Sequence, residues 1–297
     1  IEDMQTFSGN LVSNGDFSQE GSELLTNGDF ATDSGWSKGT GWSISGGSAS
    51  RTAQSGSTAC DQSISLNANK TYKIVYDLTV DAGSFNVRFS GTTNVNGETR
   101  TTSGTYTDYL KAATGNNTFR LVGADSTFTG SIDNVSVKEV GQDWDLNTGW
   151  SIGDGKATFE NSQGAGNLIQ GNVLEVGKYY KLTFDTLETN STSFAYSLGS
   201  GFEFINPIEP NSTYTVFGTA GGTSINLRGT SIFNGSITNI SVIEITDDTN
   251  LPRIDYSPYS GAGTCGHWLF EPQSTNLLDY SQDFSQNYWG KQSATVT

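Results

Sequence analysis

One histidine and two cysteines are the residues in this sequence best suited to nucleophilic or metal chemistry. His267 lies two residues after Cys265, and Cys60 is distant from both in the sequence. A Ser-His-Asp or Cys-His set requires the fold to place a nucleophile beside the histidine, and no spacing argues for one here. Cys265 and His267 together make half a zinc site. A pair of carboxylates for glycoside hydrolysis stays an open alternative, because the chain has 31 Asp and Glu residues. None of them lies in a recognisable catalytic motif. We therefore expect no enzyme.

Charge and composition exclude further classes of function. The 297 residues carry a net charge of −16, which opposes binding to a phosphate backbone, so we expect no nucleic-acid partner. No apolar run approaches the ~20 residues of a membrane-spanning helix, so we expect no membrane insertion. Cys60 and Cys265 fall in different predicted modules. A disulfide between them is possible but cannot be inferred from the sequence, and we expect free thiols.

The elements that would position any site belong to a repeated unit. GWSISGGSASRT from Gly41 matches GWSIGDGKATFE from Gly149, and KTYKIVYDLTV from Lys70 matches KYYKLTFDTLE from Lys178, both at an offset of 108 residues. GSIDNVSVKEV from Gly130 matches GSITNISVIEI from Gly235 at an offset of 105. These steady offsets indicate one duplicated module of ordinary domain size, with small insertions or deletions in loops.

Each unit has the alternation of β-strands with one face on a core. The expected inward residues in the first unit include Tyr72, Ile74, Tyr76, Leu78, Phe85, Val87 and Phe89. The last strand of each unit breaks this alternation, which predicts a β-bulge at Asp133-Asn134 and another at Thr238-Asn239. Frequent Gly, Ser and Asn turns and the absence of helical periodicity complete an all-β pattern.

The predicted fold is therefore all-β, with tandem antiparallel β-sandwich (jelly-roll) modules and an irregular connector. A short phrase ending in Asp-Phe, which we name the opener, precedes the strands: NLVSNGDF from Asn10, ELLTNGDFATDSGW from Glu23 and NLLDYSQDFSQNYW from Asn276. The third opener indicates that a third module starts near the C-terminus and that the chain is a piece of a longer array. The expected division is a lead-in with a partial repeat at 1–21, module 1 at 22–140, module 2 at 141–246, a connector at 247–275 and the truncated third module at 276–297.

These motifs resemble two known groups of proteins. The opener LLTNGDFATDSGW and the closing GSIDNVSV resemble carbohydrate-binding modules of the galactose-binding jelly-roll type, and this resemblance covers about three quarters of the chain. The connector NLPRIDYSPYSGAGTCGHWLFEPQSTNLL from Asn250 is similar to a segment of bacteriophage tail-fibre and other virion proteins. IEDMQ at the start resembles the end of a lead-in peptide in those proteins.

The first resemblance implies a structural calcium ion between the opener and the last strand. In module 1 the matching residues are Asn27, Asp29 and Asp133, which carry the oxygen ligands that calcium prefers. In module 2 Thr238 replaces Asp133, and the opener is reduced to Asp143-Trp144-Asp145. We therefore expect calcium in module 1 only. The alternative is that these residues only cap turns.

A sugar site needs an aromatic platform bordered by polar groups. Trp42 and Trp150 recur at equal positions in the two modules, which indicates core residues rather than a platform. The better candidates face outward and differ between modules. They are Asn86, Arg88 and the loop residues Tyr106 and Tyr109 in module 1, and Phe202 and Phe204 in module 2.

Together these features favour a non-enzymatic structural protein of a phage particle, located on the virion and attached to host-surface glycans. Several weak modules on one particle would bind more strongly together than singly. The expected partners are host glycans, other virion proteins and further copies of the chain as a homo-oligomer. One alternative is a purely architectural capsid-decoration or fibre protein without a glycan ligand. Another is the binding appendage of a secreted polysaccharide-degrading enzyme.

Overall fold

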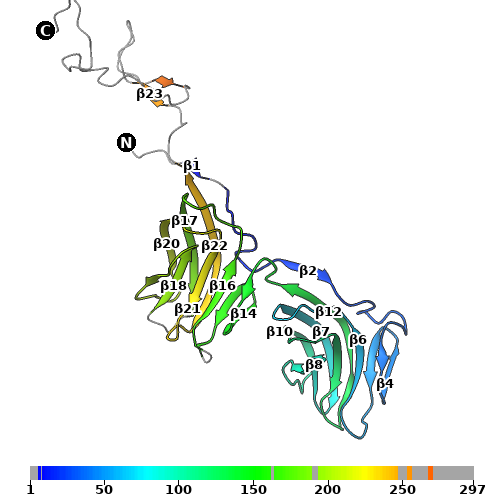
Figure 1. Ribbon diagram of the computed structural model, residues 1–297. Helices are drawn as coiled ribbons and strands as arrows, with labels where there is room; N and C mark the ends of the chain where they lie inside the picture. The colour runs from blue at the N-terminus through cyan, green and yellow to red at the C-terminus, as the bar shows by residue number, and fades with distance from the viewer. Residues whose placement is uncertain are drawn as a thin grey trace, which may run out of the picture. The chain divides into compact units, whose positions relative to one another are not determined.

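The computed structural model describes residues 6–7, 9–161, 164–188, 193–246, 253–255 and 267–269. The chain divides into two compact units, one of residues 7–245 and one of residues 1–6 and 246–297. All named elements in the described residues are β-strands (Figure 1), which confirms the all-β class. No described helix has the length and apolar character needed to span a membrane.

Module 1 is a sandwich of two antiparallel sheets. The first sheet has the order β10-β7-β12-β5-β4, with β2 paired to β12. Its strands are β2 (Glu20–Glu23), β4 (Trp42–Ser45), β5 (Ser48–Arg51), β7 (Thr71–Ala82), β10 (Gly104–Lys111) and β12 (Thr129–Val140). The second sheet has the order β3-β6-β11-β8-β9, formed by β3 (Ser37–Lys38), β6 (Thr58–Ser63), β8 (Phe85–Ser90), β9 (Val95–Asn96) and β11 (Thr118–Gly123).

Module 2 repeats this arrangement. Its first sheet has the order β14-β15-β22-β17-β20, with β1 paired to β22. The strands are β1 (Thr6–Phe7), β14 (Trp150–Gly153), β15 (Lys156–Phe159), β17 (Tyr179–Leu187), β20 (Thr213–Thr219) and β22 (Gly235–Thr246). The second sheet has the order β13-β16-β21-β18-β19, formed by β13 (Asp145–Leu146), β16 (Gly166–Gln170), β18 (Phe194–Leu198), β19 (Glu203–Ile205) and β21 (Ile225–Gly229).

The alternating residues fill the space between the sheets, as the sequence predicts. Tyr72, Ile74, Tyr76, Leu78, Phe85, Val87 and Phe89 are all buried in one cluster. Trp42 and Trp150 are 7% and 2% exposed, which confirms them as core residues. Cys60 is a free, buried thiol, and burial raises its pKa to about 12. It is therefore a small core residue without thiolate chemistry.

Both predicted bulges are present. The β12–β7 register shifts between Asp133 and Ser136, and the β17–β22 register shifts at the pair formed by Asp185 and Thr238. Asn134 and Asn239 have φ angles of 50° and 52°, a left-handed conformation that Asn tolerates better than most residues. The extra residue restores the inward facing of the following valines and isoleucines.

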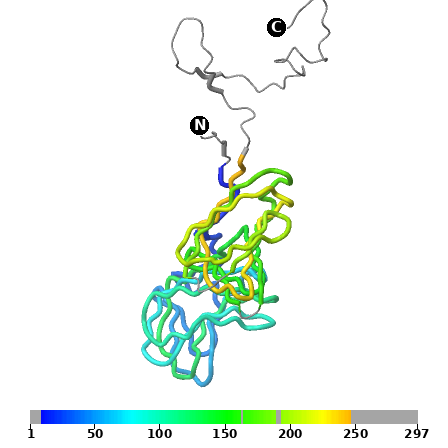
Figure 2. Tube along the Cα trace, turned by 90° about the vertical axis from the view of Figure 1, so that its left-hand side faces the viewer, coloured from blue at the N-terminus to red at the C-terminus, as the bar shows by residue number. Residues whose placement is uncertain are grey.

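The opener of module 2 differs from the expected one. Phe17 lies in the module 2 core and its ring centroid is 5.5 Å from that of Trp144. Trp144 donates a hydrogen bond to the carbonyl oxygen of Asn14, just as Trp36 does to that of Asn27 in module 1. Residues 14–17, rather than Asp143-Trp144-Asp145, therefore form this opener. Figure 2 shows the blue N-terminal segment beside the end of β22.

Module 1 is consequently inserted into module 2. The chain makes the opener of module 2, completes module 1 from β2 to β12, and then returns to module 2 at Trp144. Gln170 fixes the join, because its side chain accepts a hydrogen bond from the Ser13 N–H and donates one to the Ser13 carbonyl. Residues 11–17 of the expected lead-in thus belong to module 2.

The connector has its own local structure. β23 (Arg253–Asp255) and β24 (His267–Leu269) pair as a two-stranded antiparallel sheet. Cys265 and the predicted third module at 276–297 lie outside the described residues.

Candidate functional site

The outer face of the second sheet in module 2 carries aromatic, cationic and amide side chains in register. Strand β21 alternates Ile225 and Leu227 toward the core with Asn226 and Arg228 away from it. Arg228 is paired with Ala195 on one side and with Asn167 on the other. Ala195 is in turn paired with Phe204. Because cross-strand partners share a face, these four residues form one outward row.

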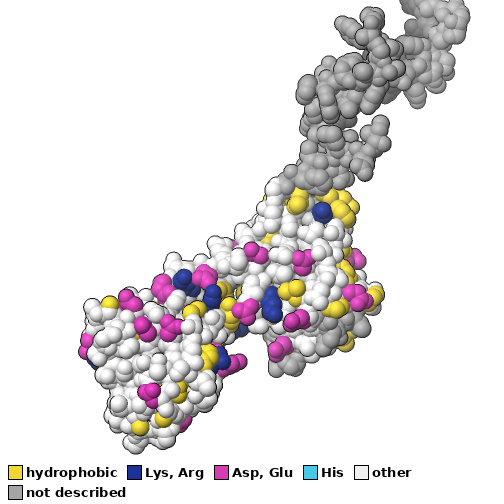
Figure 3. All heavy atoms as spheres, turned by 180° about the vertical axis from the view of Figure 1, so that it is seen from behind, with side chains coloured by type: hydrophobic (Ala, Val, Ile, Leu, Met, Phe, Trp, Pro, Cys, Tyr) yellow, Lys and Arg dark blue, Asp and Glu magenta, His cyan; other side chains and the backbone are white. Residues whose placement is uncertain are grey.

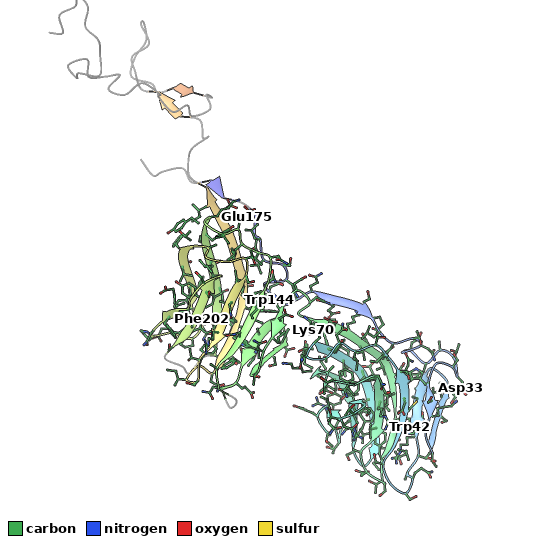
Figure 4. All side chains as sticks on the ribbon, in the orientation of Figure 1. Asp33, Trp42, Lys70, Trp144, Glu175 and Phe202 are labelled. Atoms are coloured by element: carbon green, nitrogen blue, oxygen red, sulfur yellow. The ribbon has the colours of Figure 1, made fainter. Side chains whose placement is uncertain are left out.

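The row Phe204–Ala195–Arg228–Asn167 crosses four strands, a span of about 14 Å at the usual strand spacing. Phe204 is 65% exposed. The Arg228 guanidinium lies 4.8 Å from the ring centroid of Phe202, a cation–π contact. This contact holds the Phe202 ring and the Arg228 guanidinium donors in place beside the exposed ring of Phe204. Figure 4 places Phe202 on the side of module 2 away from Trp144 and Lys70.

Unsatisfied polar atoms mark the same face. Asn167 and Asn226 each have a buried side-chain oxygen with no hydrogen-bond partner in the structure. Leaving such an oxygen unpaired costs free energy, so buried acceptors of this kind usually meet water or a ligand. The two acceptors belong to adjacent strands, and Asn167 is paired with Arg228.

The corresponding face of module 1 is charged instead of aromatic. Its row is Asn96–Arg88–Arg120–Asp61–Ser37, given by the pairings of β9, β8, β11, β6 and β3. Arg120 Nη2 lies 3.1 Å from Asp61 Oδ2, and Arg88 Nε donates to Asn96 Oδ1 at 2.6 Å. Burial raises the pKa of Asp61, and the Coulombic attraction of Arg120 opposes that rise.

This face of module 1 also has unsatisfied polar atoms. They are Asp61 Oδ1, Asn86 Oδ1, Ser90 Oγ and Arg120 Nε, all buried and without a partner in the structure. Figure 3 shows acidic side chains scattered over the face of the molecule in view, with few Lys and Arg among them. Two adjacent arginines on one sheet face are therefore unusual for this acidic chain.

The predicted sugar residues fall in different places. Arg88, Phe202 and Phe204 lie on the outer faces just described, and Asn86 shares the face of Arg88 but is only 7% exposed. Tyr106 and Tyr109 are not loop residues, because both belong to β10. The Tyr106 ring is 5.8 Å from that of Tyr76, and Tyr109 packs on module 2. Neither reaches the row that contains Arg88.

Sequence reasoning missed Asn167, Asn226 and Arg228 in module 2, and Asp61, Asn96 and Arg120 in module 1. The alternation that predicts Ile225 and Leu227 as inward already requires Asn226 and Arg228 to face outward. The row itself was hidden, because it depends on the register between strands that are distant in sequence.

The predicted calcium residues are occupied with turn hydrogen bonds. The Asn27 side chain accepts from Thr32 N–H and donates to the carbonyls of Thr32 and Ser34. Asp29 and Asp133 each accept a nearby backbone N–H. The described residues contain no group of three or more His, Cys, Asp or Glu placed to hold a metal. Calcium in module 1 stays a prediction.

A hollow at the end of module 2 is one competing site. It has a volume of about 350 Å³ and is lined by Thr158, Glu160, Asn161, Glu188, Asn234, Gly235 and Ser236. It contains carboxylates and amides but no aromatic ring. The outer row of module 2 is better suited to a ligand with both apolar and polar faces.

Comparison with known proteins gives fold-level likenesses only. No protein-family model and no curated protein matches the sequence. One similar solved structure is the N-terminal CBM22-1-CBM22-2 tandem domain of Paenibacillus barcinonensis Xyn10C, with 10% identity, a TM-score of 0.33 and coverage of 76% of this chain and 98% of that one. Another is Paenibacillus xanthan lyase, with 14% identity, a TM-score of 0.26 and coverage of 73% of this chain and 25% of that one. Values this low assign neither a family nor a ligand.

Proposed function

We propose that this protein binds carbohydrate, without catalysis, through the outer faces of the second sheets of its two modules. The observation that carries the proposal is the row in module 2, where Phe202 stacks on Arg228 beside the exposed ring of Phe204. A sugar ring has an apolar face that packs on an aromatic side chain and hydroxyls that bond to amides and guanidinium groups. The row supplies both kinds of contact on a rigid sheet.

The unpartnered oxygens of Asn167 and Asn226 support the same proposal. Rotation of either amide side chain would present its oxygen to a sugar hydroxyl, while the Arg228 guanidinium donates to sugar oxygens. The face is open and crosses several strands, so it suits an internal stretch of a chain more than a single buried sugar. We expect affinity to come from few contacts and therefore to be weak for each module alone.

Module 1 favours a different sugar chemistry. Arg88 and Arg120 are directly paired across β8 and β11. Adjacent guanidinium groups suit carboxylate or sulfate groups, which they bind with charge-assisted hydrogen bonds. Asp61 limits the positive charge by pairing with Arg120. We therefore assign acidic sugars to module 1 and neutral sugars to module 2.

The experiment is a glycan screen with the intact chain and with two variants. Arg228→Ala removes the stacked cation of module 2, and Arg88→Gln with Arg120→Gln neutralises module 1. We expect each variant to lose one subset of the glycans bound by the wild type while melting normally. Glycans that bind both variants as well as they bind the wild type, or a screen without any ligand, would overturn the proposal.

The biological setting belongs to the same proposal. We propose that the chain is a surface protein of a phage particle and that glycan binding attaches the particle to its host. This rests on the resemblance of the connector, of which the structure describes residues 253–255 and 267–269. Modules repeated on one particle would raise the overall affinity by multivalency.

Two alternative settings predict different results. A purely architectural protein would show no glycan ligand, and its outer faces would be covered by neighbouring proteins in the particle. An appendage of a secreted polysaccharide-degrading enzyme would be absent from virions. Antibody labelling of intact particles distinguishes the settings, because label on projecting fibres supports attachment, label over the shell supports decoration, and no label supports the enzyme appendage.

A further inference from the structure

The two modules contact each other through one face of module 1. Tyr109 lies on the outside of β10 and packs against the core residues of module 2. A Cβ atom on Gly153, at the end of β14, would lie 3.0 Å from Cγ of Tyr109, so the hairpin backbone rests on the ring. Burial raises the pKa of Tyr109, and a hydrogen bond from the backbone N–H of Asp154 opposes that rise.

Two lysines extend this contact. Lys70 Nζ donates to the carbonyl oxygen of Trp144 at 2.8 Å and lies 3.3 Å from Asp145 Oδ1. Lys111 Nζ donates to the carbonyl oxygen of Leu146 at 3.3 Å. Figure 4 labels Lys70 and Trp144 close together at the junction between the modules. The contact therefore joins a defined face of one module to a defined hairpin of the next.

Module 2 has the same face, and it is open. Tyr109 is paired with Lys73 in module 1, and Phe217 is paired with Lys181, the repeat counterpart of Lys73, in module 2. Phe217 is 50% exposed and stacks on Tyr179, which is 45% exposed, with a centroid distance of 6.5 Å and an interplanar angle of 17°. Val176, three residues before Tyr179 in the sequence, is 67% exposed. We name Val176, Tyr179 and Phe217 the stacked patch.

Module 1 has the matching hairpin, and it is open too. The β4–β5 turn is the repeat counterpart of the β14–β15 turn, so Ser45 and Gly46 correspond to Gly153 and Asp154. A Cβ atom on Gly46 or Gly47 would have no atom within 4 Å, and both glycines have positive φ angles, 63° and 79°. Within the chain, the β10 face of module 1 is covered by the β14–β15 hairpin of module 2. The stacked patch of module 2 and the β4–β5 hairpin of module 1 stay exposed.

We propose that copies of this chain associate head to tail, with the β4–β5 hairpin of one copy docked on the stacked patch of the next. The contact repeats one part of the internal geometry, a ring on the outer face of β10 or β20 covered by a hairpin turn. The lysine contacts are not repeated, because Lys178, the counterpart of Lys70, is paired with Glu175 and Glu244, and Thr219 stands in place of Lys111. The hydroxyl of Tyr109 and the side chain at Asp154 are both absent from the new pair, Phe217 with Gly46, so no polar group is left unmatched there. Such a heterologous contact propagates into a fibre or closes into a ring.

In the copy-to-copy contact, Ser45 takes the position that Gly153 has in the internal contact. Its side chain makes the copy-to-copy contact looser than the internal one. The Ser45 Cβ atom would approach the Phe217 ring as closely as a Cβ atom on Gly153 would approach Tyr109, so one element must shift by a few tenths of an ångström. The internal contact also has the linkage of one chain, which the external contact lacks. Association is therefore expected only at high local concentration, as on a particle.

Mixed cysteine cross-linking tests the proposal. Two proteins are prepared, each with Cys265→Ser, one carrying Ser45→Cys and the other Thr215→Cys, an exposed position on the same face of β20 as Phe217 that keeps the ring in place. Buried Cys60 stays protonated in both, since its pKa is about 12. Under mild oxidation we expect the mixture to give a disulfide-linked dimer at least tenfold faster than either protein alone. A third protein with Ile232→Cys, an exposed position in module 2, serves as the mismatched control for Ser45→Cys.

Two results would overturn the proposal. Thr215→Cys cross-linking with itself at the rate of the mixture would show patch-to-patch pairing instead. Equal rates of cross-linking of Ser45→Cys with Ile232→Cys and with Thr215→Cys would show random collision. Sedimentation equilibrium at high protein concentration adds a reversible readout. Phe217→Glu should abolish the self-association of the wild type, while Phe204→Glu, on the other sheet, should not. Self-association is separate from glycan binding, so Phe217→Glu should bind glycans like the wild type.

Discussion

The second sheets of modules 1 and 2 share a core face and differ on the outer face. Phe85, Val87 and Phe89 point into one core, as Phe194, Tyr196 and Leu198 point into the other. On the outside, Asn86 and Arg88 stand where Ala195 and Ser197 stand. The inner face is restricted by packing, whereas the outer face can change with little cost to the fold. The inward positions change only among apolar and aromatic side chains, whereas the outward positions change in charge and polarity, which is what two different ligands would produce.

The largest expected effect tests how the modules are joined. A Cβ atom on Gly15 would lie 2.0 Å from the carbonyl oxygen of Ile240, and one on Gly28 would lie 2.0 Å from that of Val135. Gly15→Val should therefore destabilise module 2 by about 3 kcal/mol. Hydrogen exchange should show lost protection in β22 and unchanged protection in β12.

Gly28→Val should give the opposite pattern, with protection lost in β12 and kept in β22. Gly9→Val is the control, since a Cβ atom there would meet no atom within 4 Å. Loss of protection in module 1 alone after Gly15→Val would contradict the inserted arrangement, because the residues that follow Gly15 directly in sequence lead into module 1.

The next effect concerns the arginines of module 1. Arg88→Gln with Arg120→Gln should weaken binding of a uronate-containing oligosaccharide by about 2 kcal/mol, the range of a charge-assisted hydrogen bond. Calorimetric titration at low and high salt checks this, because screening should weaken the wild type more than the variant. Unchanged affinity of the double variant for this oligosaccharide would contradict the assignment of acidic sugars to module 1.

A smaller effect separates the exposed phenylalanines of module 2. Phe204→Ala should weaken glycan binding about tenfold, or ~1.4 kcal/mol, through loss of an aromatic contact. Phe217→Ala removes a ring of similar exposure from the opposite sheet and should leave binding unchanged. Titration of both variants with one neutral oligosaccharide measures the difference. Equal losses would place the ligand elsewhere.

The smallest effect is a pH dependence specific to module 1. Hydrogen bonds from Lys73 and Lys138 lower the pKa of Glu20 below its usual 4.5. The stability that Glu20 contributes is therefore present above about pH 4.5 and is lost as the pH falls through the lowered pKa. Thermal melting between about pH 6 and pH 3 should show this loss, and Glu20→Gln should reduce it. An unchanged pH profile in Glu20→Gln would contradict the role of these bonds.

The sequence predicts strands, inward residues and bulges well, because these follow from local alternation. The bulge at Asn134 is an example, since one extra residue between inward Ile132 and Val135 can be read directly. The opener of module 2 does not follow from local alternation. The sequence predicts it at Asp143-Trp144-Asp145, because the true partners Phe17 and Trp144 are separated by all of module 1. A count could have found it, because one complete Asn-Gly-Asp-Phe opener precedes module 1 and a second lies at its start, while module 2 has none of its own after residue 140.

The candidate site was only partly predictable for a related reason. Arg88, Phe202 and Phe204 are recognisable as outward residues within their own segments. Their grouping with Arg228, Asn167 or Arg120 depends on register across strands, which sequence spacing does not give. The role of Tyr109 was hidden because its partner, the β14–β15 hairpin, belongs to the other module.

Nuclear magnetic resonance mapping of a bound oligosaccharide tests the central claim most directly. Isotopically labelled chain would be titrated with the tightest neutral glycan from the screen, and the backbone amide shifts would be followed. Carbohydrate recognition by the outer face predicts shifts in β16, β18, β19 and β21, centred on Arg228. Shifts confined to β17, β20 and β22, on the opposite sheet, or to the hollow lined by Glu160 and Glu188, would contradict it.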